Sequence, residues 1–404
     1  MQYKIKGAIL VLLTLLLWGN SAKSQSIIKS KFGKGIYLVA ADSSFSMKFS
    51  LRFQTLYEGS TTSAAEEWED NFLIRRSRLK FEGFAFTPKL EYKIELGLSN
   101  RDIGSDLEPQ FNFADNIILD AVAKWNFAPN FELWVGQTKL PSNRERVISS
   151  QKLQFVDRSL LNSRFNIDRD QGIQLHHAHQ VGQVVLREIG SISMGEGRNI
   201  TTDNVGGYDY TARVEVLPFG EFEGEGDYVG SDIYREEKPK LSIAASYDYN
   251  DGTNRAGGQL GDFLSEQRDL STVFVDAMFK YRGFSVMAEY ANKEALSNSS
   301  GEETEGGPVV RRDAEGNVEE TFITGNAINL QAGYLFKTNW EVAGRYTSYD
   351  PTAVTELRAE NQYTLGVSKY IVGHSLKVQS DVTLQQQERR DDVYQFRLQL
   401  EVAL

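Results

Sequence analysis

Residues 394–404, at the end of the chain, read YQFRLQLEVAL, and this stretch decides the fold. Apolar side chains occupy every second position from Tyr394 to Leu404, and polar ones, among them Arg397 and Glu401, stand between them. This alternation predicts a β-strand with one apolar and one polar face. A soluble β-sandwich would not bury these full charges without partners, whereas the water-filled lumen of a membrane barrel tolerates them.

The same period of two recurs along the chain, for example in FSMKFSLRFQ (45–54) and LEYKIELGL (90–98). Strands of about ten residues have the length that crosses a bilayer at a tilt. The pattern therefore predicts an all-β fold, a transmembrane antiparallel β-barrel of about 16 strands. The predicted strands are 45–57, 72–86, 89–99, 115–127, 131–139, 171–178, 183–194, 207–217, 240–250, 271–281, 284–293, 326–336, 339–349, 361–370, 374–387 and 390–403.

Short and long connections alternate between these strands, and one side of short turns with one side of long loops is typical of outer-membrane barrels. Segment 218–239 is a long connection on the short-turn side, so the strand count stays open there by one pair. Loop 294–325 is expected to be solvated rather than folded. Aromatic residues near strand ends indicate interfacial girdles: Tyr57, Phe84, Phe86, Trp125, Phe127, Trp340 and Tyr349.

The N-terminus has the pattern of a signal peptide at residues 1–24. Two lysines precede an apolar run from Ala8 to Trp18, and small residues follow at Ala22 and Ser24. This run is too short to span a bilayer as a helix. We predict a periplasmic N-terminal segment at 25–44 and the barrel at 45–404. Loss of residues 1–24 removes three lysines and no acid, which changes the net charge from −11 to −14.

Composition excludes several classes of function. With no cysteine, the chain has neither disulfides nor thiolate metal sites. The acidic balance argues against nucleic-acid binding, and no G-x-S-x-G nucleophile motif is present. His176, His177 and His179 could hold a metal, but their place near a turn favours exposed polar residues at the rim. The sequence therefore predicts no enzyme, no cofactor and no metal.

Loop 140–170 is net basic within an acidic chain, and an inward-folded third loop of this kind would narrow the lumen. Cations facing a pore concentrate anions. Arg52, and some of Arg75, Arg76 and Arg78, project from the first two strands into the same lumen. In the alternative interpretation, the loop arginines pair with lumen carboxylates and tie the loop to the wall. The basic residues of the loop region are Lys139, Arg144, Arg146, Lys152, Arg158, Arg164 and Arg169.

Five motifs carry a family resemblance. They are FLIRRSRLKFEG (72–83), GQTKLPSNRERVISS (136–150), FVDRSL (155–160), DRDQGIQL (168–175) and YDYTARVEVLPFGE (208–221). In order and spacing they resemble the phosphate-selective porin O and P family of Gram-negative outer membranes. The resemblance implies a sixteen-stranded barrel in outer-membrane lipid, a homotrimer, and an inward third loop that forms a constriction lined by basic residues.

The resemblance also implies roles for individual residues. Arg52 resembles the first-strand arginine of the family, and Arg75 with Arg76 resembles its second-strand pair. Lys139 matches the lysine that opens the third loop. The predicted constriction and anion-binding set is Arg52, Arg75, Arg76, Arg78, Asp120, Lys139, Arg146 and Arg158.

The predicted function is a passive outer-membrane diffusion channel for small, phosphate-like anions or other small polar solutes. One alternative is a non-conducting structural or adhesive barrel that acts through its long acidic loops. An outer-membrane hydrolase is the other alternative.

Overall fold

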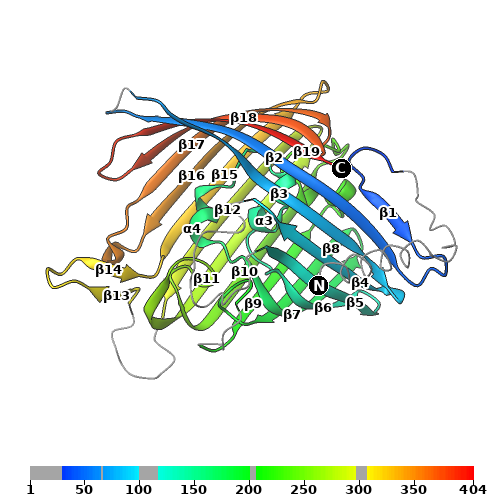
Figure 1. Cartoon of the computed structure of the whole chain (residues 1–404), viewed down its shortest axis with the longest axis horizontal. Helices are drawn as coiled ribbons and strands as arrows, with labels where there is room; N and C mark the ends of the chain where they lie inside the picture. The colour runs from blue at the N-terminus through cyan, green and yellow to red at the C-terminus, as the bar shows by residue number, and fades with distance from the viewer. Residues whose placement is uncertain (1–29, 65–66, 100–116, 201–205, 297–306) are drawn as a thin grey trace, which may run out of the picture.

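Sixteen antiparallel strands close into a single barrel (Figure 1). The computed structural model describes residues 30–64, 67–99, 117–200, 206–296 and 307–404. Each barrel strand pairs with its neighbours in the chain, and closure comes from β19 against β2, where Leu398 is opposite Tyr57. The strand count confirms the sequence prediction. The predicted signal peptide, residues 1–24, lies outside the described residues.

The barrel strands are β2 (Ser46–Thr62), β3 (Glu69–Ala85), β4 (Thr87–Gly97), β5 (Ile118–Ala128), β6 (Phe131–Lys139), β7 (Arg169–Val181), β8 (Val184–Ser193), β9 (Asp209–Leu217), β10 (Lys240–Arg255), β11 (Phe263–Tyr281), β12 (Phe284–Ala295), β15 (Gly325–Leu335), β16 (Trp340–Pro351), β17 (Glu360–Val372), β18 (Leu376–Gln387) and β19 (Val393–Ala403). The remaining elements are β1 (Ile36–Val39), β13 (Val309–Arg312), β14 (Val318–Thr321), α3 (Arg144–Val147), α4 (Leu160–Phe165) and the 3₁₀ turns η2 (Ser150–Lys152), η3 (Glu223–Tyr228) and η4 (Ala353–Thr355).

The burial pattern of the wall is the reverse of that in a soluble protein. In β19, Leu398 and Leu400 are 43% and 39% exposed, whereas Glu401, next to Leu400, is fully buried. In β16, Val342 is exposed and its neighbour Glu341 is buried. Apolar side chains therefore face outward, where lipid would cover them, and polar ones face the lumen. Among the described residues, no helix is long and apolar enough to cross a membrane.

The strands are longer on the loop side than the sequence predicted. β11 begins at Phe263 and β10 continues to Arg255, so most of the predicted loop 251–270 is paired backbone. The alternation of apolar and polar residues is lost in this part, because polar residues occupy both faces: Glu266 is exposed, whereas Arg268 and Asp269 are buried. The two strands continue here through backbone pairing, which cannot be predicted from hydropathy.

Three connections differ from the expectation or extend it. In the loop 294–325, β13 and β14 pair as a hairpin, so the expectation of an unfolded loop is wrong for residues 309–321. Segment 218–239 adds no strand and instead folds inward through η3. In the predicted periplasmic segment 25–44, β1 pairs with β2 and extends the barrel sheet beyond the end of β19.

The short turns on the opposite side have the backbone geometry of tight hairpins. Arg282 and Gly283, between β11 and β12, have φ values of 50° and 92°. Two successive residues with positive φ define the turn whose twist matches that of paired strands. Near these turns Trp125, Phe127 and Trp340 are exposed on the outer face, but Tyr349, also predicted for a girdle, is buried against Phe165 inside the barrel.

Candidate functional site: the constricted lumen

The loop between β6 and β7 folds into the barrel, where Figure 1 shows α3 and α4 inside the ring of strands. Ser159 begins α4 by accepting a hydrogen bond from the Asn162 backbone amide. The apolar side of α4 then packs against the inner wall of β11, β12, β15 and β16. This cluster contains Leu140, Leu160, Leu161, Phe165, Ile167, Phe274, Ala291, Ala327 and Tyr349. Burial of these side chains holds the loop inside the lumen.

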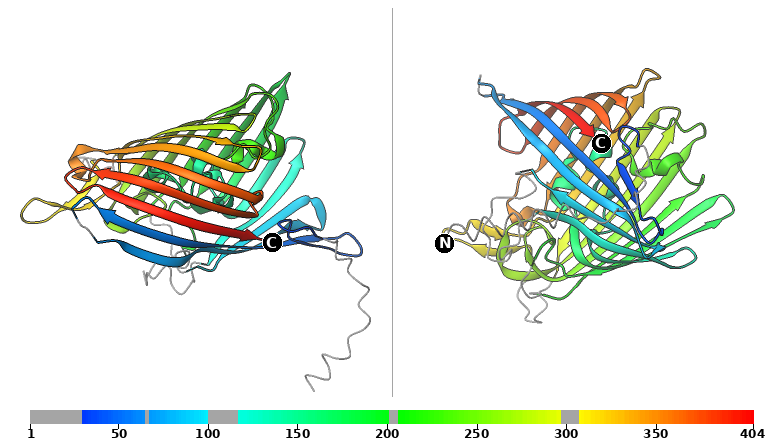
Figure 2. Two further views of the ribbon diagram at one scale, coloured as in Figure 1. Left: turned by 90° about the horizontal axis from the view of Figure 1, so that it is seen from above. Right: turned by 45° about the vertical axis from the view of Figure 1, so that its right-hand side comes forward.

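The inward segment 218–239 packs against the same loop from the opposite end of the barrel. Ile148 and Leu153 of the loop share an apolar cluster with Phe222. The Gly230 amide also donates to the Lys152 carbonyl at 2.8 Å. Together the two segments fill one side of the lumen. Figure 2 shows the tilted wall around them from two further directions.

A buried charge network joins both segments to the wall. The Arg144 guanidinium is fully buried, with Nε 2.7 Å from Asp276 Oδ1 and Nη2 2.8 Å from Ser242 Oγ. Its Nη1 donates to the Asp227 carbonyl of the inward segment. Arg213 binds the second oxygen of Asp276 at 2.7 Å. With the loop in this position, each charge of the network has a partner of opposite sign.

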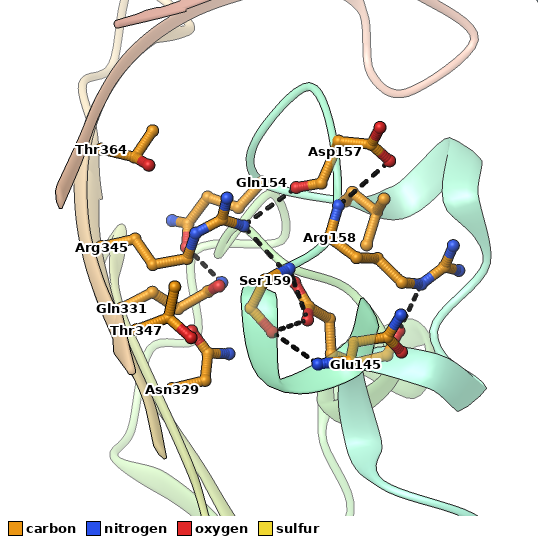
Figure 3. A network of polar contacts seen from close by, with 12 residues as sticks. Glu145, Gln154, Asp157, Arg158, Ser159, Asn329, Gln331, Arg345, Thr347 and Thr364 are labelled. Carbon is orange, nitrogen blue, oxygen red and sulfur yellow. Dashed lines mark hydrogen bonds and ion pairs between the residues drawn. The ribbon is translucent and has the colours of Figure 1, made fainter. Parts of the chain in front are cut away.

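A second set of contacts holds the tip of the loop against β16 (Figure 3). Arg345 Nη1 donates to the Asp157 carbonyl at 2.9 Å. Glu145 accepts from the Ser159 hydroxyl at 2.5 Å and from its amide at 2.9 Å. The Arg158 guanidinium donates to the carbonyls of Glu145 and Ile148. These bonds fix the orientation of Asp157 toward the open side of the lumen.

The open side of the lumen is a cavity of about 1070 Å³ with a strongly cationic lining. Its acidic residues are Glu95, Glu132, Asp157, Asp168 and Glu225. Its basic residues are Arg52, Arg75, Arg76, Arg78, Lys93, Lys124, Lys139, Arg146, Lys152, Arg158, Arg169, Arg187, Arg198, Arg213, Arg345 and Arg397. Within the described part of the chain, the cavity thus has 16 basic residues against 5 acidic ones, although the net charge of the whole chain is −11.

The predicted arginine pair of β3 lies in this cavity and holds a carboxylate from the loop. Arg75 Nη2 contacts the two oxygens of Asp157 at 2.7 and 3.0 Å, and Arg76 Nη2 contacts one of them at 3.0 Å. Arg52 donates to Ser150 of the loop at 2.7 Å and lies 3.4 Å from Glu401. All three arginines line the cavity.

The other predicted residues make contacts that hold the loop or the wall in place. Lys139 Nζ donates to three loop carbonyls, and Arg146 pairs with Asp168. Arg78 lies 3.7 Å from Glu95. Asp120 is fully buried, contacts Lys93 at 2.7 Å and Arg169 at 3.0 Å, and does not line the cavity. The alternative interpretation, in which the basic residues have a structural role, therefore applies to part of the predicted constriction set. Several of these cations hold the loop in place and also line the cavity.

Sequence reasoning did not place Arg345 and Arg397 at the constriction. Both occupy inward positions in strands far along the chain, β16 and β19, and Arg397 binds Asp381 at 2.7 Å. The signal that could have found them is the alternation itself, combined with closure of β19 on β2. Closure brings the last strand beside the arginines of the first two.

Asp157 remains ionised over the ordinary pH range. Burial opposes its ionisation, but the charges of Arg76 and Arg75 hold its pKa well below the usual range. Protonation would remove a negative charge and raise anion preference. We therefore expect equal reversal potentials between about pH 5 and pH 8. A parallel measurement on the double variant His176→Gln, His177→Gln controls for the two imidazoles that line the same cavity, and a rise in anion preference at pH 5 in both proteins would contradict the expectation.

A closed barrel with an apolar exterior, a charged lumen and an inward loop defines the class of outer-membrane channels. The chain belongs to the phosphate-selective porin O and P family, whose model matches residues 47–401. The protein is therefore an outer-membrane porin. A search among curated proteins found no match.

Solved porins share the fold at low sequence identity. The anion-selective porin from Comamonas acidovorans is 12% identical with a TM-score of 0.54, over 89% of this chain and 100% of that one. The outer membrane channel DcaP of Acinetobacter baumannii is 12% identical with a TM-score of 0.55, over 91% and 99% of the two chains. OmpF of Salmonella typhi, in complex with daunomycin, is 12% identical with a TM-score of 0.55, over 90% of this chain and 99% of that one.

Proposed function

We propose that this porin is a passive channel selective for small, phosphate-like anions across the outer membrane of a Gram-negative bacterium. The observation that carries the proposal is the excess of basic over acidic side chains around the open cavity. A narrow water-filled path lined by one sign of charge raises the local concentration of the opposite ion. The phosphate selectivity for which the family is named and the anion selectivity of the Comamonas acidovorans porin favour the same class of solute.

The contacts of Asp157 support oxyanions in particular. Its carboxylate is held by both Arg75 and Arg76, so the pair presents donors in a geometry that two oxygens on one centre can accept. Phosphate presents the same kind of acceptor edge to a guanidinium fork. A passing oxyanion would compete with Asp157 for these donors. This favours transit through successive weak contacts over tight retention.

Replacement of Arg52, Arg75 and Arg76 by alanine tests the proposal. We expect the reversal potential in a KCl gradient to move toward that of a non-selective pore, and phosphate to block chloride current less. An Arg389→Ala variant serves as a control, because Arg389 is exposed in the turn between β18 and β19 and does not line the cavity. Unchanged selectivity in the triple variant would refute the assignment. Absence of any conductance in the unmodified protein would favour the non-conducting barrel.

The porin is further proposed to be a homotrimer, as the family resemblance implies. OmpT of Vibrio cholerae, 10% identical with a TM-score of 0.50, is described in a trimer form. The mass of the detergent-solubilised protein by light scattering tests this state, and a monomeric mass would contradict it. No catalytic step is proposed for the lumen, since its charged groups fit transport.

A further inference from the structure

Two histidines and a glutamate meet on β7 and β8, and one of them, His177, also borders the open cavity. His177 and His179 belong to β7, and Glu188 belongs to β8, where it is directly opposite His177. His177 also stacks on Phe131 of β6, with ring centroids 4.3 Å apart. Phe131 in turn contacts Phe127, which is exposed on the outer face. The cluster therefore lies among outward aromatic side chains, close to the turn between β7 and β8.

The distances in this cluster match those around a tetrahedral metal ion. Glu188 Oε2 lies 2.9 Å from His177 Nδ1 and 3.7 Å from His179 Nδ1. The three ligand atoms all fall within 4.8 Å of one another. Ligands bound to Zn²⁺ at about 2.0–2.2 Å in tetrahedral geometry are separated by about 3.3 Å. Small side-chain rotations would thus bring all three atoms to one centre.

A second observation concerns His179 itself. Its Nδ1 atom is buried, yet it makes no hydrogen bond within the described part of the chain. A buried imidazole nitrogen that makes no hydrogen bond costs free energy, and a bound cation would satisfy it. The side chains remain 28% (His177), 32% (His179) and 40% (Glu188) exposed, so an ion could reach the site from the turn side of the barrel.

We propose that His177, His179 and Glu188 form a binding site for a transition-metal ion of the Zn²⁺ class, with water as the fourth ligand. Two imidazoles and one carboxylate suit Zn²⁺ and the neighbouring divalent transition metals, and they do not suit Mg²⁺ or Ca²⁺, which prefer all-oxygen sites. The ion replaces the hydrogen bond between His177 and Glu188 and connects β7 to β8.

Calorimetric titration of Zn²⁺ into the full-length, tag-free protein in detergent tests the site. After treatment with EDTA, we expect about one ion per chain with a Kd of about 10 µM or tighter, unaffected by excess Mg²⁺ or Ca²⁺. His179→Ala should weaken binding by at least about tenfold, and so should Glu188→Gln, which keeps the shape of the side chain.

His176→Ala is the matched control, since this adjacent histidine faces the lumen and stacks on Trp134. Its affinity for Zn²⁺ should equal that of the unmodified protein. Heat-modifiable migration in electrophoresis confirms that each variant is folded. No binding by the folded unmodified protein, full binding by both His179→Ala and Glu188→Gln, or displacement by Ca²⁺ would each overturn the proposal.

Discussion

Replacing Arg144 by methionine is expected to release the constriction loop from the wall. The guanidinium is fully buried and contacts Asp276 at 2.7 Å and the Asp227 carbonyl at 3.2 Å. Without it, Asp276 keeps Arg213 as its charged partner, while the loop loses its ion pair with the wall and one of its contacts with the inward segment. Loss of a hydrogen bond to a charged group costs about 1.5–3 kcal/mol, which shifts the equilibrium between seated and released loop by about 10- to 10²-fold.

A released loop should widen the path and move its cations away from the wall. Single-channel recordings should therefore show a larger conductance and a weaker anion preference, and the loop should become sensitive to limited proteolysis. Arg164→Met is the matched control, because Arg164 belongs to the same loop but its pair with Glu360 is partly exposed and worth about 1 kcal/mol or less. Identical conductance and protease resistance in Arg144→Met would show that apolar packing alone seats the loop.

Replacing Asp157 by asparagine is expected to raise both anion preference and the strength of phosphate block. Asp157 neutralises part of the charge of Arg75 and Arg76 at contacts of 2.7 to 3.0 Å. The neutral amide keeps the size of the side chain but frees these donors for a passing anion. At the effective dielectric of a partly hydrated site, loss of this competing charge should tighten phosphate block about tenfold, or about 1.4 kcal/mol.

The dose dependence of phosphate block in planar bilayers measures this effect. Glu225→Gln is the matched control, since Glu225 is an exposed carboxylate of the inward segment that lines the same cavity. Weaker block in Asp157→Asn would mean that Asp157 orients the arginines and that its charge does not limit anion access. Equal shifts in the two variants would assign the effect to overall lumen charge.

The wall of the barrel could be predicted almost completely from sequence. In β19 the face of each residue depends only on its neighbours, so Leu398 and Leu400 identify the lipid side and Glu401 the lumen side without any knowledge of the fold. The basic character of loop 140–170 is equally local, because it can be counted from the residues of the loop.

The roles of individual charges in the lumen could not be predicted in this way. Asp120 belongs to the predicted constriction set, but it is buried with Lys93 and Arg169 and holds them in place. Arg397 was not a candidate, yet it lines the cavity. Sequence shows which residues carry charge on the polar face, but it does not show which of them already have partners.

By itself, the sequence predicted a membrane barrel of about sixteen strands, a basic third loop and the family. The alternation of apolar and polar residues is a property of neighbouring positions in the chain, so it can be recognised without knowledge of distant contacts. Tertiary structure alone decided that Arg144 is buried. It also decided that Arg75 and Arg76 both contact the Asp157 carboxylate and line the open cavity. Only the pairing of β7 with β8 brings Glu188 to His177 and His179. The reason is physical: the partners of Arg144 lie up to 132 residues away, and barrel closure sets their positions.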